Sequence, residues 1–230
     1  AEKNPKVLLL ERARTPGDKN MSGSYLFRNI SEELFPGFQQ AKFHDGQIRI
    51  GGIDFRWLYD NDEKRFGICA SSGSDAFHDM MIVYRNESDE WFANEAVKAG
   101  AELKIALATD LIWETKNGEN TRVVGVITDQ GEFRAPVVID ASGLNSILAH
   151  RAGLVDWPLE KITLAIKYIY KVDGDKLRER LMLYKDTDGV EVDWGAMPTM
   201  CGEDPAFWGT HAVGCPDRGL VNIIVYQQLK

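Results

Sequence analysis

The sequence lacks several features that would define a function at once. It has no apolar run near the ~20 residues that a bilayer-spanning helix needs, and its charged first residues do not resemble a signal peptide. Its three cysteines lie far apart and form no Cys-x-x-Cys pair, which argues against zinc and disulfide patterns. This cysteine usage predicts a cytoplasmic protein, and peripheral attachment to a membrane stays open.

Clustered positive charge and catalytic histidine motifs are also absent. The net charge of −8 and a pI near 5.1 argue against nucleic acid as a partner, because phosphate backbones are bound by clustered Lys and Arg. The four histidines are isolated, and neither His-Glu-x-x-His nor Gly-x-Ser-x-Gly occurs. The sequence therefore predicts no metal site and no hydrolase.

The most informative segment that is present is Val7 to Arg12, in which four aliphatic residues precede Glu11. A Rossmann unit places such an acid about 20 residues after a Gly-x-Gly-x-x-Gly turn. Only ten residues precede Glu11, and none is glycine. We expect a second Rossmann strand whose first strand and phosphate loop lie outside this sequence. A buried parallel strand without a nucleotide has the same pattern.

The remaining hydrophobic pattern predicts alternating strands and helices. We expect helices over 30–35, from a cap at Asn86 or Ser88 to Gly100, from 146 to 151, and over 175–183. Strands are expected within 47–71 and over 80–85, 102–108, 111–115, 122–128, 133–140, 162–170, 190–197 and 220–227. Their order divides the chain into two interleaved parts, one of residues 1–29 and 85–156, the other of 30–84 and 157–230.

Three segments in this order resemble a known family: the strand ending at Glu11, the loop Pro16-Gly-Asp-Lys-Asn-Met-Ser-Gly23, and the turn Asp140-Ala-Ser-Gly143. They are similar to FAD-dependent flavoproteins of the glutathione-reductase type, above all the FixC-like and electron-transfer-flavoprotein quinone oxidoreductase group and the related geranylgeranyl reductases. The resemblance implies a mixed α/β fold. A partial FAD-binding, Rossmann-like domain with a β-meander would interleave with an antiparallel-sheet substrate domain.

The resemblance also implies which residues bind FAD. Glu11 would hold the ribose, with Arg12 on the adenine side, and Lys19, Asn20 and Met21 would lie near the pyrophosphate and flavin. Arg85 would approach the phosphates, the backbone of Leu107 and Ala108 would meet the adenine edge, and Ala141, Ser142, Gly143 and Ser146 would form a helix N-terminus facing the pyrophosphate. Three of these assignments have a simpler alternative: Arg12 and the loop could be plain surface, and Arg85 could be an ion-pair partner of Asp89 or Glu87.

Three departures from the family pattern affect the assignment. Many relatives carry Asp-Gly where this chain has Ser142-Gly143. The family's late Gly-Asp motif is missing, since Gly174-Asp175 runs into a predicted helix and does not match it. Geranylgeranyl reductases commonly carry a cysteine in the loop at 19–23, where Met21 and Ser22 stand. The third departure favours the FixC-like branch.

The resemblance implies an FAD-dependent oxidoreductase that passes electrons between a flavoprotein donor and a quinone or ferredoxin-type acceptor. It names no catalytic side chain, because electron transfer through a flavin needs none. Two alternatives remain: a reductase of prenyl double bonds that acts on a prenyl lipid, and a cofactor-free binding module. We expect these 230 residues alone to bind FAD weakly or not at all.

Overall fold

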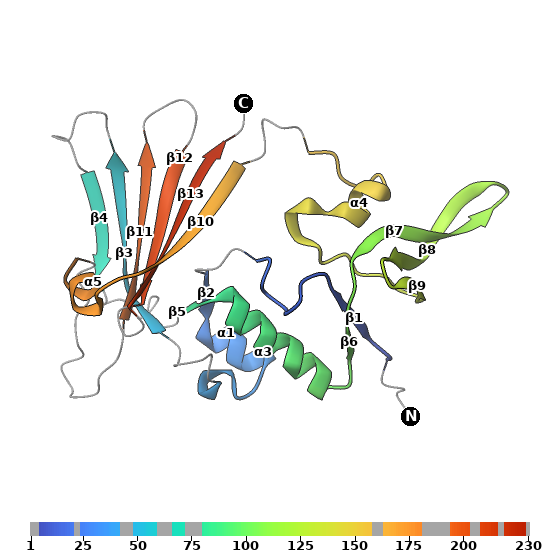
Figure 1. The fold of residues 1–230 in the computed structure, drawn as a ribbon, viewed down its shortest axis with the longest axis horizontal. Helices are drawn as coiled ribbons and strands as arrows, with labels where there is room; N and C mark the ends of the chain where they lie inside the picture. The colour runs from blue at the N-terminus through green and yellow to red at the C-terminus, as the bar shows by residue number, and fades with distance from the viewer. Residues whose placement is uncertain are drawn as a thin grey trace. The chain divides into compact units, whose positions relative to one another are not determined.

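The structure, a computed structural model, describes residues 5–20, 24–41, 48–58, 66–71, 80–157, 163–180, 194–202, 208–215 and 219–228. The chain divides into two compact units (Figure 1). Unit 1 comprises Ala1–Lys19 with Glu90–Pro158, and unit 2 comprises Asn20–Asp89 with Leu159–Lys230. The borders drawn from the sequence, at residues 29, 85 and 156, differ from these, and the functional assignment of the two parts stays a prediction.

A short parallel sheet begins unit 1. Strand β1 (Leu8–Glu11) lies beside β6 (Glu102–Ile105), which follows helix α3 (Arg85–Lys98). Val7 and Glu11 accept hydrogen bonds from the β6 side through their carbonyl oxygens. Because backbone groups alternate along a strand, those of Leu8 and Leu10 face the opposite edge, where the described residues provide no further strand.

A three-stranded meander and one short helix complete unit 1. Its strands are β7 (Ala108–Lys116), β8 (Glu119–Thr128) and β9 (Gly131–Arg134), all antiparallel as expected. Asn117 and Gly118 both have positive φ, which the tight turn between β7 and β8 requires. Leu111 and Val126 of the meander pack against Leu148 of helix α4 (Ile147–Arg151). This cluster is the core that holds the meander to α4.

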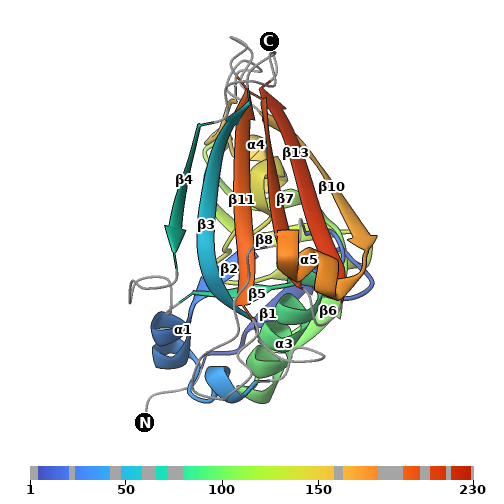
Figure 2. The same cartoon turned by 90° about the vertical axis from the view of Figure 1, so that its left-hand side faces the viewer.

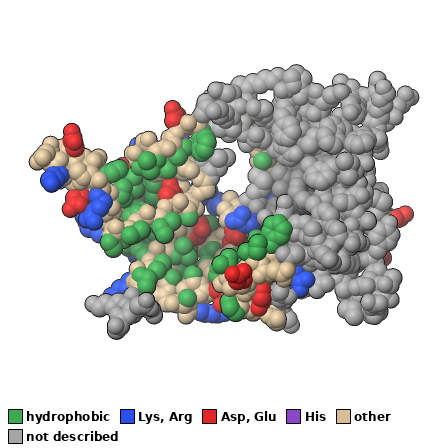
Figure 3. All heavy atoms as spheres, turned by 180° about the vertical axis from the view of Figure 1, so that it is seen from behind, with side chains coloured by type: hydrophobic (Ala, Val, Ile, Leu, Met, Phe, Trp, Pro, Cys, Tyr) green, Lys and Arg blue, Asp and Glu red, His purple; other side chains and the backbone are tan. Residues whose placement is uncertain are grey.

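The strand expected over 133–140 is wrong in its second half, because β9 ends at Arg134. Val138 packs on the core cluster, but Val137 and Ile139 are 71% and 85% exposed. Figure 3 shows apolar side chains gathered on the visible face of this unit. The alternating pattern is that of a strand, but a strand needs a hydrogen-bonded neighbour. Ala135 still donates to the carbonyl of Val124 in β8, and no described strand pairs with 136–142.

Unit 2 is built on an eight-stranded sheet (Figure 2). In order across the sheet its strands are β10 (Thr163–Lys171), β13 (Leu220–Gln228), β12 (Trp208–Cys215), β11 (Trp194–Gly202), β3 (Ile48–Leu58), β5 (Met80–Val83) and β2 (Ser24–Phe27), with β4 (Phe66–Ser71) also on β3. All pairings are antiparallel except that of β3 with β11. The sequence pattern did not predict β2 or β12.

Two helices of unit 2, α1 (Arg28–Leu34) and α5 (Gly174–Arg180), lie close to where the sequence predicts them, and the short helix η1 (Phe38–Gln40) was not expected. Helix α1 is followed by Gly37, whose φ of 92° ends it before η1, and α5 follows β10. In the part of the chain that the structure describes, no helix combines the length and apolarity needed to cross a bilayer.

The predicted cap of α3 is wrong. The helix begins at Arg85, so Asn86 and Ser88 lie inside its first turns. The carbonyl oxygen of Tyr84 accepts hydrogen bonds from the backbone N–H groups of Glu87 and Ser88, which starts the helix one residue before the expected cap. Its predicted end is confirmed, since Gly100 has a φ of 105° and donates to the carbonyl of Val97.

Candidate functional site

Glu11 ends β1 and turns its carboxylate back onto the following loop. Its Oε1 accepts a 2.6 Å hydrogen bond from the backbone N–H of Ala13, a residue that is 1% exposed. Among the described residues, Oε2 enters no hydrogen bond. Glu11 thus stabilises the start of the loop with one oxygen and keeps the other as an acceptor, while the next residue, Arg12, is exposed.

The loop after β1 contains the turn that its composition predicts. Asp18 donates its N–H to the carbonyl of Thr15, and the intervening Gly17 is buried with a φ of 93°. A side chain at that φ is strained, so glycine suits the turn. Lys19 is exposed after the turn, and Met21 lies outside the described residues.

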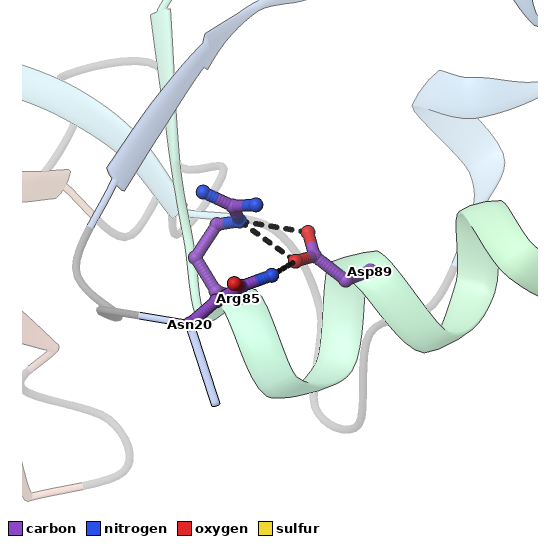
Figure 4. Close-up of polar contacts among 3 residues, drawn as sticks. All are labelled: Asn20, Arg85 and Asp89. Carbon is purple, nitrogen blue, oxygen red and sulfur yellow. Dashed lines mark hydrogen bonds and ion pairs between the residues drawn. The ribbon is translucent and has the colours of Figure 1, made fainter. Parts of the chain in front are cut away.

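Two of the predicted residues are brought together by a third that the sequence analysis considered only as an ion-pair partner (Figure 4). The carboxylate of Asp89 accepts from Arg85 Nε at 2.7 and 3.0 Å, and it also accepts from the side-chain amide of Asn20. The ion-pair alternative for Arg85 is therefore present with Asp89. The contact with Asn20, 69 positions away, had no sequence signal because the register of the two segments depends on the fold.

The backbone predicted to meet an adenine edge already has a partner. Leu107 donates its N–H to Asp129 Oδ1 at 2.8 Å, and its carbonyl oxygen accepts from the N–H of Asp129 at 3.1 Å. Ala108 starts β7 opposite Thr128. A purine edge at Leu107 would have to displace the Asp129 carboxylate.

The turn predicted to face a pyrophosphate is occupied by its own aspartate. Asp140 accepts from the N–H of Ser142 at 2.9 Å and, through its other oxygen, from the N–H of Ala149 in α4 at 3.0 Å. Burial alone would raise the pKa of Asp140, but the bonds from the Ser142 side chain, the Ser142 N–H and the Ala149 N–H lower it below its ordinary value. The first turn of α4 therefore has a carboxylate as its anion.

The rest of that turn is compact and partly strained. Ala141, Ser142 and Gly143 are exposed, and Ser146 adopts a φ of 37° while its hydroxyl donates to the carbonyl of Gly143 at 2.6 Å. A positive φ at a serine is uncommon and is held here by that bond. Within the described ranges, no group of His, Cys, Asp and Glu is arranged to hold a metal ion.

Two solved structures that are similar to this chain show its fold. One is a geranylgeranyl bacteriochlorophyll reductase-like protein from Thermoplasma acidophilum, with a TM-score of 0.67 and 22% identity over 97% of this chain and 50% of that one. Another is CtdE in complex with FAD and a substrate, with a TM-score of 0.63 and 15% identity over 98% of this chain and 52% of that one. The chain therefore has the fold of FAD-dependent oxidoreductases, with mixed α/β architecture.

Sequence comparison narrows this class. Protein FixC of Bradyrhizobium diazoefficiens is 31% identical over 200 residues, which are 84% of this chain and 44% of FixC. The probable electron transfer flavoprotein-quinone oxidoreductase YgcN of Escherichia coli is 35% identical over 77% of this chain and 40% of its own length. No family model matches the chain. The chain is a relative of the FixC and electron-transfer-flavoprotein quinone oxidoreductase group, and it spans less than half the length of these relatives.

Proposed function

We propose that the protein is an FAD-dependent oxidoreductase and that Glu11 binds the adenosine ribose. The observation that carries the proposal is the Glu11 carboxylate at the carboxyl end of a parallel strand, with Oε2 outside the hydrogen bonds of the described residues. Nucleotide ribose is held at this position in Rossmann-type sheets, because a carboxylate accepts from both ribose hydroxyls. The relationship to FixC and YgcN supports the same cofactor.

Some of the predicted binding residues have hydrogen-bonding groups that suit FAD, and others do not. Glu11 offers an acceptor for the ribose, and Lys19 and Arg85 offer cationic donors of the kind that suits phosphate oxygens. Leu107 and Ala149 fit less well, because Asp129 and Asp140 already accept their N–H groups. We therefore assign binding to the Glu11 strand, the loop after it and Arg85.

When bound, the isoalloxazine of FAD would supply the redox chemistry, and the protein would supply binding and orientation. Glu11 would hold the sugar while keeping the loop start in place through Ala13. Arg85, kept in position by Asp89, would offset anionic charge. The proposal thus gives these residues binding and orienting roles and names no catalytic side chain.

For the electron partners we propose a flavoprotein donor, such as an electron-transfer flavoprotein, and a quinone or ferredoxin-type acceptor. The name of YgcN, a probable electron transfer flavoprotein-quinone oxidoreductase, supports this pairing at 35% identity. The wide spacing of the cysteines supports a cytoplasmic location. Reduction of prenyl double bonds is the second candidate, favoured by the fold of the Thermoplasma acidophilum protein.

The test is a titration of FAD into the protein expressed from its complete coding sequence, followed by flavin absorbance. We expect a stoichiometric yellow complex that, once reduced, passes electrons to a quinone analogue. Oxidation by a prenyl diphosphate alone would replace the first candidate with the second. Protein that stays colourless at saturating FAD would refute both and support the cofactor-free alternative.

A further inference from the structure

The carboxylate of Asp89 joins two segments that are distant in the sequence. Arg85 is the first residue of α3, and Asn20 is the last described residue of the loop after β1. Asp89 accepts from Arg85 Nε through both oxygens and from the amide of Asn20 through Oδ2 (Figure 4). Its side chain is 18% exposed and that of Arg85 is 39% exposed, so the pair is partly shielded from water.

Helix stability alone is a poor explanation for this arrangement. A cation at the first residue of a helix lies at the positive end of the helix dipole, where it is unfavourable. A cation that precedes the acid by four positions is also the weaker orientation of a helix ion pair. Arg85 therefore opposes local helix preference, which is expected where a residue is kept for binding rather than for folding.

The hydrogen bonds to Asp89 fix the orientation of the Arg85 and Asn20 side chains. Asp89 fixes the guanidinium of Arg85 through its Nε, and Figure 4 draws one terminal nitrogen of Arg85 on the side away from Asp89. Because the side-chain amide of Asn20 donates an N–H to Asp89, the orientation of that amide group is fixed as well. Side chains that are ordered before a ligand arrives do not lose rotamer entropy on binding, so they bind it more tightly.

We infer that Asp89 is a positioning residue that orients Arg85 and Asn20 for an anionic, nucleotide-type cofactor. The inference rests on the proposed function and deepens it, since it concerns the same cofactor. Asp89 itself makes no contact with the cofactor. It raises cofactor affinity by holding the arginine and the loop in their binding positions.

The experiment compares Asp89→Asn with wild type in the protein expressed from its complete coding sequence. Asparagine keeps the size of the side chain but loses the charge and one acceptor oxygen. Glu95→Gln is the matched control, because Glu95 lies on the same helix and accepts from Lys98 Nζ at 2.6 Å in an exposed ion pair. The readouts are the Kd for FAD, the absorbance spectrum of bound flavin, and solvent exchange of the Arg85 Nε–H in cofactor-free protein by NMR.

We expect Asp89→Asn to raise the Kd for FAD about tenfold or more, as loss of charge-assisted hydrogen bonds predicts. It should also speed exchange of the Arg85 Nε–H, and Glu95→Gln should change neither. If the wild-type protein binds FAD and Asp89→Asn binds it with the same Kd, the positioning role is refuted and the proposed function stands. Wild-type protein that binds no FAD would refute the proposed function and, with it, this inference.

Discussion

Substitutions of Glu11 separate its structural role from its proposed role in binding. Its Oε1 accepts from the N–H of Ala13 at 2.6 Å, and its Oε2 is the proposed ribose acceptor. Glu11→Gln keeps one oxygen for Ala13 and loses the charge. Glu11→Ala removes both acceptors and leaves the N–H of a buried residue without its partner.

The two variants should differ in stability. An unsatisfied buried donor costs about 1–3 kcal/mol, so Glu11→Ala should lower the free energy of unfolding by about that amount. Exchanging a charged acceptor for a neutral one costs about 1 kcal/mol, so Glu11→Gln should cost no more than that. Urea unfolding, monitored by circular dichroism, measures both values.

Their effects on FAD binding should be more alike. A hydrogen bond to a charged acceptor contributes about 1.5–3 kcal/mol, so losing the carboxylate should raise the Kd for FAD roughly 10- to 100-fold in either variant. Glu102→Gln is the control, because Glu102 is an exposed carboxylate on the neighbouring strand, opposite Leu8. A Kd for Glu11→Gln equal to that of wild type would refute the ribose assignment, and a fully stable Glu11→Ala would refute the role in the loop.

Three further substitutions test unit 1. Gly125→Ala should destabilise the meander by about 1–3 kcal/mol in urea unfolding, because the added Cβ would lie 2.3 Å from the carbonyl oxygen of Phe133; a variant as stable as wild type would contradict this close approach. Asp140→Asn should flatten the acid branch of a curve of stability against pH. Because the pKa of Asp140 is lowered in the folded protein, its carboxylate contributes stability at pH values above the ordinary pKa of 3.8, and this stability is lost as the pH falls through the lowered pKa. An unchanged curve would argue against its bonds to Ser142 and Ala149. Ile139→Ser should change the stability of the 230-residue chain by less than about 0.5 kcal/mol, because the side chain is 85% exposed. A larger loss in thermal unfolding would show that Ile139 is covered.

The sequence predicted the local elements whose causes are local. The aliphatic run before Glu11 forms β1, Asn117-Gly118 forms the turn between β7 and β8, and Gly100 ends α3. These follow from side-chain periodicity and from backbone conformations that glycine and asparagine adopt readily. The resemblance to FixC-like flavoproteins also came from short motifs, each made of neighbouring residues, and the comparisons confirm it.

The expected strand over 133–140 shows where local pattern fails. Val137 and Ile139 alternate as strand residues do, yet residues 136–140 pair with no strand among the described residues and stay outside the sheets. The start of α3 was misplaced for a related reason, since the Tyr84 carbonyl, rather than a polar side chain, accepts the first N–H groups. Both outcomes depend on what a backbone group meets in space.

The amino-acid sequence by itself determined the secondary structure of most described segments, the family resemblance and the identity of the candidate cofactor residues, because these are properties of neighbouring residues. Only the tertiary structure decided which donors are already occupied: Leu107 by Asp129, Ala149 by Asp140, and both Asn20 and Arg85 by Asp89. A hydrogen bond requires two atoms within about 3 Å, and chain folding alone brings positions as distant as 20 and 89 that close.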